Sequence, residues 1–155
     1  IPGAGTTLSI YLPGYIQEKM PETAPLPREP IQKGTETILL VEDEPAILKM
    51  IRIMLEQHGY AVLTASSPTA ALSLAENHSD GIHLVLTDVV MPEMNGRDLA
   101  EKLTSRYPDL KVLFMSGYTA DTIAHQGVLD NGIAFIQKPF SIQDMIQKIR
   151  HLLDN

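Results

Sequence analysis

The sequence predicts an α/β domain built on a doubly wound parallel sheet with helices on both faces. From Thr37 onward, short apolar runs alternate with helix-like segments, and the first and third runs are continuously apolar. Continuous apolar runs are typical of strands covered on both faces, and the alternation with helices is typical of parallel crossovers. With 155 residues, 44% of them hydrophobic, the chain is long enough for one such domain with attached segments.

Each predicted strand is a short apolar run, and each predicted helix has apolar residues every three to four positions. The expected strands cover residues 38–41, 60–64, 84–87, 111–115 and 133–136. The expected helices begin near Pro45, Ser67, Gly96, Ala120 and Ser141. Proline suits the first turn of a helix, and Ser141 is expected to cap the last one.

Composition excludes several classes of function. The chain has no cysteine, so disulfides, thiolate metal sites and a cysteine nucleophile are excluded. The formal net charge of −7 belongs entirely to Thr35–Asn155, because the charges before Thr35 cancel. An acidic domain lacks the basic footprint that nucleic-acid binding requires. No apolar run is long enough to span a membrane, and no signal-peptide pattern is present.

The first 34 residues differ from the rest. Residues 1–14 combine a glycine turn with a strand-like run, which cannot be stable alone in water. Residues 15–34 contain four prolines and few large apolar groups, as expected of a semi-extended linker. We therefore expect a domain at 35–155 preceded by a linker and by the remnant of another domain, as a piece of a longer protein.

Polar side chains follow four of the predicted strands. Glu42 and Asp43 follow the first, Asp88 the third, Ser116 the fourth and Lys138 the fifth. The carboxyl ends of parallel strands meet at one edge of the sheet, where ligands of such folds bind. The five side chains are therefore expected to lie close together.

This group of side chains is suited to phosphoryl transfer. Clustered carboxylates repel one another unless a cation joins them, and oxygen ligands without His or Cys favour Mg²⁺, with Mn²⁺ as an alternative. Asp43 and Asp88 are the expected direct ligands, with a backbone carbonyl just beyond Asp88, and Glu42 would act through water. Asp88 can serve as a nucleophile, while Lys138 and Ser116 neutralise phosphoryl oxygens.

Each feature also has a plainer interpretation. An acid after a strand is more often a helix cap, and Ser116-Gly117 or Lys138-Pro139-Phe140 would be an ordinary turn or strand end. The acidic run after the first strand could merely complement a helix N-terminus. The joint placement of these residues at one sheet edge favours the functional interpretation.

Four segments, ILLVEDE, LTDVVMPEMNG, VLFMSGYT and FIQKPF, match in order and spacing the motifs of a known family. The chain from Thr37 to Leu153 resembles the receiver domain of two-component response regulators. This resemblance implies a flavodoxin-like fold with five strands in the order 2-1-3-4-5. It also implies that Asp88 is the phospho-accepting aspartate, with metal ligands from Asp43, Asp88 and the carbonyl of Val90, and with Glu42 assisting through water.

The resemblance implies further roles at the ends of the fourth and fifth strands. Ser116 would be the switch hydroxyl and Phe135 the aromatic switch residue, acting by packing alone because it has no hydroxyl. Lys138 would be the catalytic lysine, with a cis peptide bond to Pro139. Phosphorylation would then change the surface formed by the fourth helix, the fifth strand and the fifth helix.

The first residues carry a second resemblance. The run GAGTTLSIYLP resembles the closing segment of a histidine-kinase ATP-binding domain. Together the two resemblances imply the C-terminal receiver of a hybrid sensor histidine kinase. Neither a phospho-donor histidine box nor an ATP-binding asparagine motif is visible, so this chain would be a phospho-acceptor and not itself a kinase.

The implied partners follow from that placement. They are a histidine kinase or a histidine phosphotransfer domain, and a weak homodimer is a further option. Neither binding to nucleic acid nor contact with a membrane is expected of this chain. The implied location is the cytoplasm, in bacterial-type signalling. Anchoring of the parent protein in a membrane is compatible with this location.

Two other functions remain open from the sequence. One is a receiver-like interaction module that never carries phosphate, against which the complete set of polar residues argues. The other is a phosphatase-type hydrolase with an aspartate nucleophile. Such enzymes usually need a second acid two residues after the nucleophile, and that position here is Val90.

Overall fold

The computed structural model describes Tyr11 and residues 33–78, 81–117 and 133–155. The predicted N-terminal strand and the Pro-rich linker lie outside these residues, apart from Tyr11, Lys33 and Gly34, as does the helix predicted at 120–127. The division of the chain at residues 14 and 34 therefore stays a prediction. Within the described part of the chain, no helix is long and apolar enough to cross a bilayer.

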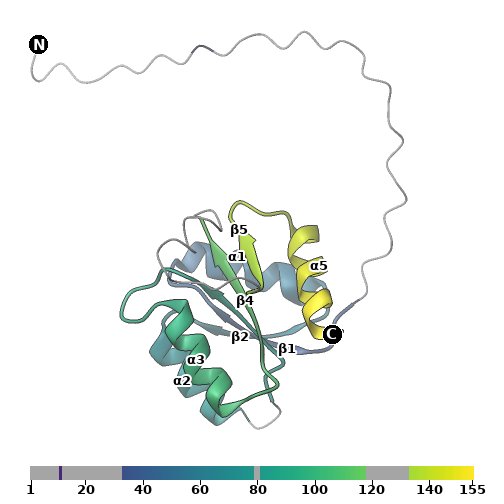
Figure 1. The fold of residues 1–155 in the computed structure, drawn as a ribbon. Coiled ribbons are helices and arrows are strands. Elements are labelled where there is room, and N and C mark those ends of the chain that lie inside the picture. The colour runs from purple at the N-terminus through teal and green to yellow at the C-terminus, as the bar shows by residue number, and fades with distance from the viewer. Residues whose placement is uncertain (1–10, 12–32, 79–80, 118–132) are drawn as a thin grey trace, which may run out of the picture.

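In the described part of the chain, five parallel strands form the centre of the domain, in the order β2-β1-β3-β4-β5 (Figure 1). This order confirms the predicted flavodoxin-like arrangement. The sequence order differs from the spatial order because β1 lies between β2 and β3. The strands are β1 (Thr37–Val41), β2 (Ala61–Ala65), β3 (Leu84–Asp88), β4 (Lys111–Ser116) and β5 (Phe135–Gln137).

The described helices cover both faces of the sheet (Figure 1). Helices α1 (Pro45–Gln57) and α5 (Ile142–Leu153) pack on one face, and α2 (Pro68–Asn77) and α3 (Gly96–Arg106) pack on the other. In β1, Ile38 and Leu40 belong to the first core, whereas Leu39 and Val41 belong to the second. Because both faces are buried, every position of this strand had to be apolar.

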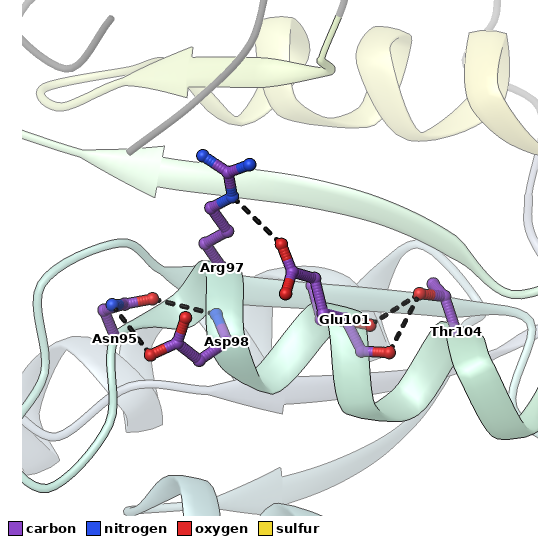
Figure 2. A network of polar contacts seen from close by, with 6 residues as sticks. Asn95, Arg97, Asp98, Glu101 and Thr104 are labelled. Carbon is purple, nitrogen blue, oxygen red and sulfur yellow. Dashed lines mark hydrogen bonds and ion pairs between the residues drawn. The ribbon is translucent and has the colours of Figure 1, made fainter. Parts of the chain in front are cut away.

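Capping residues determine where the helices begin. The Ser141 hydroxyl accepts a hydrogen bond from the backbone N–H of Asp144, whose carboxylate bonds back to Ser141 in a capping box, which confirms the predicted cap. At α3, the Asn95 side chain accepts from the Asp98 N–H at 2.8 Å (Figure 2). The first turn of α3 is thereby held directly after the loop that follows β3.

Each predicted strand differs from the observed one by one or two residues at one or both ends. The second strand begins at Ala61 instead of residue 60. Tyr60 is buried beneath the guanidinium of Arg150. The backbone N–H of Ala61 donates to Glu36 O, and this is the first hydrogen bond of the strand. The fifth strand begins at Phe135 instead of residue 133. Among the described residues, this edge strand pairs with β4 alone, and their register joins three residue pairs.

An ion pair ties the start of β1 to the end of α5. Arg150 Nη2 lies 2.5 Å from Glu36 Oε1, and both side chains are about four-fifths buried, with relative exposures of 18% and 22%. Burial alone would raise the pKa of Glu36, but the hydrogen bond from Arg150, the backbone N–H of Thr35 and the charge of Arg150 together outweigh it, and the pKa is lowered.

The lowered pKa of Glu36 gives stability a pH dependence. A carboxylate with a depressed folded-state pKa contributes stability above its unfolded pKa and loses it as the pH falls through the folded value. We expect the isosteric Glu36→Gln change to lower the free energy of unfolding by about 1 kcal/mol at neutral pH. Urea denaturation from about pH 7 to about pH 3 should show this difference shrinking below the usual glutamate range. A difference that does not change with pH would contradict the assignment.

Candidate functional site

The predicted site residues lie at the carboxyl edge of the sheet. Glu42 and Asp43 directly follow β1, Asp88 ends β3, Ser116 ends β4 and Lys138 directly follows β5. The strand register brings them to one level, since Val41 pairs with Thr87, Asp88 with Met115 and Ser116 with Gln137. The parallel sheet thus gathers residues from four strand ends, as the sequence predicts.

Three carboxylates form the centre of this edge. One oxygen each from Glu42, Asp43 and Asp88 lies within 4.8 Å of the other two. Their burial is graded: Glu42 is 1% exposed, Asp88 is half-buried and Asp43 is exposed. A ligand can therefore reach Asp43 and Asp88 from solvent, while Glu42 lies at the inner wall.

Lys138 bridges two of the carboxylates. Its Nζ donates to Glu42 Oε2 at 2.6 Å and to Asp88 Oδ2 at 2.7 Å. Burial alone would lower the pKa of Lys138, but the hydrogen bonds and charges of Asp88 and Glu42 outweigh it and raise the pKa. The ammonium is therefore charged at neutral pH.

Glu42 shares that single cation and is the most buried acid of the cluster. Burial raises its pKa, the contacts with Lys138 lower it, the charge of Asp88 raises it again, and the net effect is a raised pKa. Among the described residues, one ammonium thus faces three carboxylates, and the cluster carries surplus negative charge. An all-oxygen donor set with surplus charge fits a hard divalent cation such as Mg²⁺.

The loop after β3 forms the outer rim of the site. The Val90 N–H donates to Asp88 Oδ1 at 3.3 Å, and the Val90 side chain is 60% exposed. Val90 therefore stays beside the Asp88 carboxylate. The role of its carbonyl as a metal ligand stays a prediction.

The predicted switch residues lie beside the site and behind it. Ser116 is buried at the end of β4, and its carbonyl accepts from the Lys138 N–H at 2.7 Å. Phe135 is half-buried and packs with Phe114 and Val89, which directly follows Asp88. The Lys138–Pro139 peptide is cis, as predicted. The switch roles of Ser116 and Phe135 stay predictions.

The sequence analysis missed one buried polar residue that contacts the main chain of Asp88. The described part of the chain has three buried polar side chains, and Thr87 is the one besides Glu42 and Ser116. Its hydroxyl donates to the carbonyl of Asp88 at 3.0 Å. The available signal was a hydroxyl immediately after the apolar run Leu84–Leu86 and immediately before the acid.

Known proteins similar to this chain include a response regulator receiver protein, a sensor kinase and a probable transcriptional regulatory protein. The model of the response regulator receiver domain matches residues 38–150. The receiver protein CpdR of Brucella abortus is 32% identical, over 75% of this chain and 95% of that protein. The sensor kinase CckA of the same species is 36% identical over 98% of this chain, which spans only 17% of the kinase. The probable transcriptional regulatory protein TcrX of Mycobacterium tuberculosis is 32% identical over 76% of this chain, which spans 49% of that protein.

Solved structures agree with these relatives. The receiver domain of the hybrid histidine kinase CckA superposes with a TM-score of 0.64 and 32% identity, covering 76% of this chain and 98% of that one. A receiver domain protein from Clostridium thermocellum gives a TM-score of 0.68 at 29% identity, covering 77% and 94%.

Proposed function

Because this chain belongs to the response regulator receiver family, we propose that Asp88 accepts a phosphoryl group from a phosphohistidine. The observation that carries the proposal is the ammonium of Lys138 bound to Asp88 inside an acidic cluster that is open to solvent at Asp43. The donor would be a histidine kinase or a histidine phosphotransfer domain. The chain would thus act as the receiver of a two-component phosphorelay.

The proposed step transfers the phosphoryl group between two side chains. A carboxylate oxygen of Asp88 attacks phosphorus, the bond from phosphorus to the imidazole nitrogen breaks, and the electron pair stays on that nitrogen, which takes up a proton. Lys138, already within 2.7 Å of Asp88 Oδ2, neutralises charge on the transferring oxygens. Mg²⁺ held by Asp43, Asp88 and the Val90 carbonyl, with Glu42 acting through water, would supply the remaining positive charge.

The acyl phosphate would then act on the neighbouring strand ends. The added charge of roughly −1.5 to −2 would draw the Ser116 hydroxyl inward. Phe135, which packs behind Val89, would fill the space that is vacated. The outcome is a population shift between two packings that changes the surface near β5 and α5.

The test uses a small phosphodonor and mass spectrometry. With acetyl phosphate and Mg²⁺, the chain should gain one phosphoryl group, and Asp88→Asn should gain none. The matched control is Asp109→Asn, which changes an exposed acid before β4 and should label like the wild type. Labelling of Asp88→Asn would show that the site is wrong. A wild type that cannot be labelled would favour the phosphorylation-independent interaction module.

The alignments also bear on the parent protein. The match to the sensor kinase covers 98% of this chain, whereas the match to CpdR covers 75%. Similarity to the kinase thus extends to the residues before the domain. This extension supports the proposal that the chain is a receiver of a hybrid sensor histidine kinase.

Val90 bears on how long the phosphoryl group persists. Hydrolysis requires water to reach phosphorus from the open side of the site, and the exposed Val90 side chain stands at that rim. We expect Val90→Ala to speed phosphate loss by about tenfold, equivalent to about 1.4 kcal/mol of barrier. Tyr118, which stands two residues beyond Ser116 as Val90 stands beyond Asp88, lies outside the described residues.

The measurement is the decay of the labelled chain after the donor is removed. Met50→Ala is the control, because Met50 is an exposed apolar residue on α1, 46% exposed. Equal decay of Val90→Ala and wild type would show that this side chain does not shield the phosphorus.

A further inference from the structure

Thr87 is buried at the one strand position that directly precedes the proposed nucleophile. It is 0% exposed, and its Oγ1 donates to the main-chain carbonyl of the next residue, Asp88, at 3.0 Å. Side chains alternate along a strand, so Thr87 shares the α2–α3 face with Val85, while Asp88 turns toward Lys138. The hydroxyl therefore acts on the main chain of Asp88 from the side opposite its carboxylate.

The start of α3 closes over the same carbonyl. A Cβ added at Gly96 would stand 2.1 Å from Asp88 O and 3.2 Å from Thr87 Oγ1, so these groups are in direct contact. The Gly96 N–H donates to Val89 O at 2.9 Å. The Asp88–Val89 peptide is thus held between the Thr87 hydroxyl and the first residue of α3.

The orientation of that peptide determines where the reacting groups lie. The next N–H, of Val89, donates to Met115 O at 2.9 Å, and the Val90 N–H donates to Asp88 Oδ1 at 3.3 Å. A rotation of the Asp88–Val89 peptide would therefore move both the carboxylate and the Val90 turn. Displacements of about 1 Å in a reacting group can cost about 100-fold in rate.

We propose that Thr87 is a positioning residue whose hydroxyl holds the Asp88–Val89 peptide, and with it the Asp88 carboxylate, in the orientation for phosphoryl transfer. This inference rests on the proposed function of Asp88. A purely packing role is the competing explanation, since a threonine also fills space on a strand. Valine would fill that space without a buried hydroxyl, which is costly unless it is used.

Two substitutions separate the explanations. Thr87→Val keeps the shape and removes the hydroxyl, whereas Thr87→Ser keeps the hydroxyl and removes the methyl group. A positioning role predicts that the serine variant reacts faster than the valine variant. A packing role predicts the reverse order.

Thr104 offers a matched control on α3. Its Oγ1 also donates to a main-chain carbonyl, that of Ala100, at 2.8 Å, but within the helix (Figure 2). Thr104→Val therefore removes the same type of hydrogen bond away from the acidic cluster. Both Thr→Val changes should lower the free energy of unfolding by a similar, small amount, measured by urea denaturation.

The experiment measures labelling of the full chain by acetyl phosphate with Mg²⁺ over a range of donor concentrations. In this reaction an Asp88 oxygen bonds to phosphorus and acetate leaves with the electron pair of its phosphorus–oxygen bond. We expect Thr87→Val to lower the maximal rate by about tenfold or more with an unchanged half-saturating donor concentration. Thr87→Ser and Thr104→Val should stay within about twofold of the wild type.

The outcomes separate the two proposals. If the wild type is labelled and Thr87→Val is labelled equally fast, the positioning role is overturned and the function of Asp88 stays intact. The same conclusion follows if Thr87→Ser is labelled more slowly than Thr87→Val. A wild type that takes up no phosphoryl group overturns the proposed function, and the role of Thr87 with it. If Thr87→Val does not fold, Thr87→Ser decides: a rate near wild type supports positioning, and a tenfold loss overturns it.

Discussion

Replacing Lys138 with methionine is expected to lower the free energy of unfolding by about 3 kcal/mol at neutral pH and to slow labelling of Asp88 by about 100-fold or more. The Nζ atom lies 2.6 Å from Glu42 Oε2 and 2.7 Å from Asp88 Oδ2. Without it, the buried Glu42 carboxylate keeps no cation within reach among the described residues. The transferring phosphoryl group would also lose the ammonium that lies nearest to it.

The stability loss should depend on pH. Burial already raises the pKa of Glu42, and removal of Lys138 would raise it further, because the Lys138 contacts are what lower it. A group with a raised folded-state pKa takes up its proton earlier as the pH falls, so the buried charge disappears. The penalty of Lys138→Met should therefore be largest at neutral pH and shrink toward acid.

Arg106→Met is the matched control. Arg106 Nη1 lies 2.6 Å from Glu76 Oε1, the same separation as in the Lys138–Glu42 pair, but both side chains are more than half exposed, at 57% and 56%. Exposed pairs contribute little, so this change should cost about 0.5 kcal/mol. Adding Glu42→Gln to Lys138→Met should recover stability without recovering labelling. Equal losses for the two methionine variants would show that burial of Glu42 does not matter.

The sheet and its polar edge could be predicted because both depend on short-range patterns. Runs such as Ile38–Val41 had to be apolar at every position because helices cover both faces of the sheet. A polar residue at the carboxyl end of a parallel strand lies at the carboxyl edge of the sheet. The strand order came from the family resemblance. The positions of Glu42, Asp43, Asp88, Ser116 and Lys138 at the carboxyl ends of parallel strands predict that all five lie at one edge of the sheet.

Features that depend on distant contacts could not be predicted in this way. The length of β5 depends on its register with β4, and Glu36 pairs with Arg150 across 114 positions without any local pattern. Glu93 adopts a left-handed φ of 70°, although such positions favour glycine, and its carboxylate accepts from the Thr69 hydroxyl. Thr87 looked like an ordinary strand residue, since its role depends on what packs over the Asp88 carbonyl.

Gly96 is the residue that packs there, and Gly96→Ala is expected to have the second large effect. The added Cβ would lie 2.1 Å from Asp88 O and 3.1 Å from Asp88 C, and both are main-chain atoms that cannot rotate away. The structure gives no left-handed φ for Gly96, so the glycine is required by close approach and not by its backbone angles. Either α3 or the end of β3 must shift.

That shift would affect stability and reaction together. Forcing an extra carbon into a packed region typically costs about 1–3 kcal/mol of stability. Because the added carbon would meet main-chain atoms, we expect Gly96→Ala to lower the free energy of unfolding by about 3 kcal/mol. Labelling of Asp88 by acetyl phosphate should fall by about 100-fold, because the Asp88–Val89 peptide carries the reacting carboxylate. Denaturation in urea and the initial labelling rate measure the two effects.

Gly117→Ala is the control for stability, because a Cβ added at Gly117 would meet no atom of the described residues within 4 Å and its φ is not left-handed. It should change the free energy of unfolding by less than about 0.5 kcal/mol. If Gly96→Ala is as stable as Gly117→Ala and labels at the wild-type rate, α3 does not hold the main chain of Asp88. If stability falls while labelling of the folded fraction stays normal, Gly96 serves packing alone, and the close contact does not orient the carboxylate.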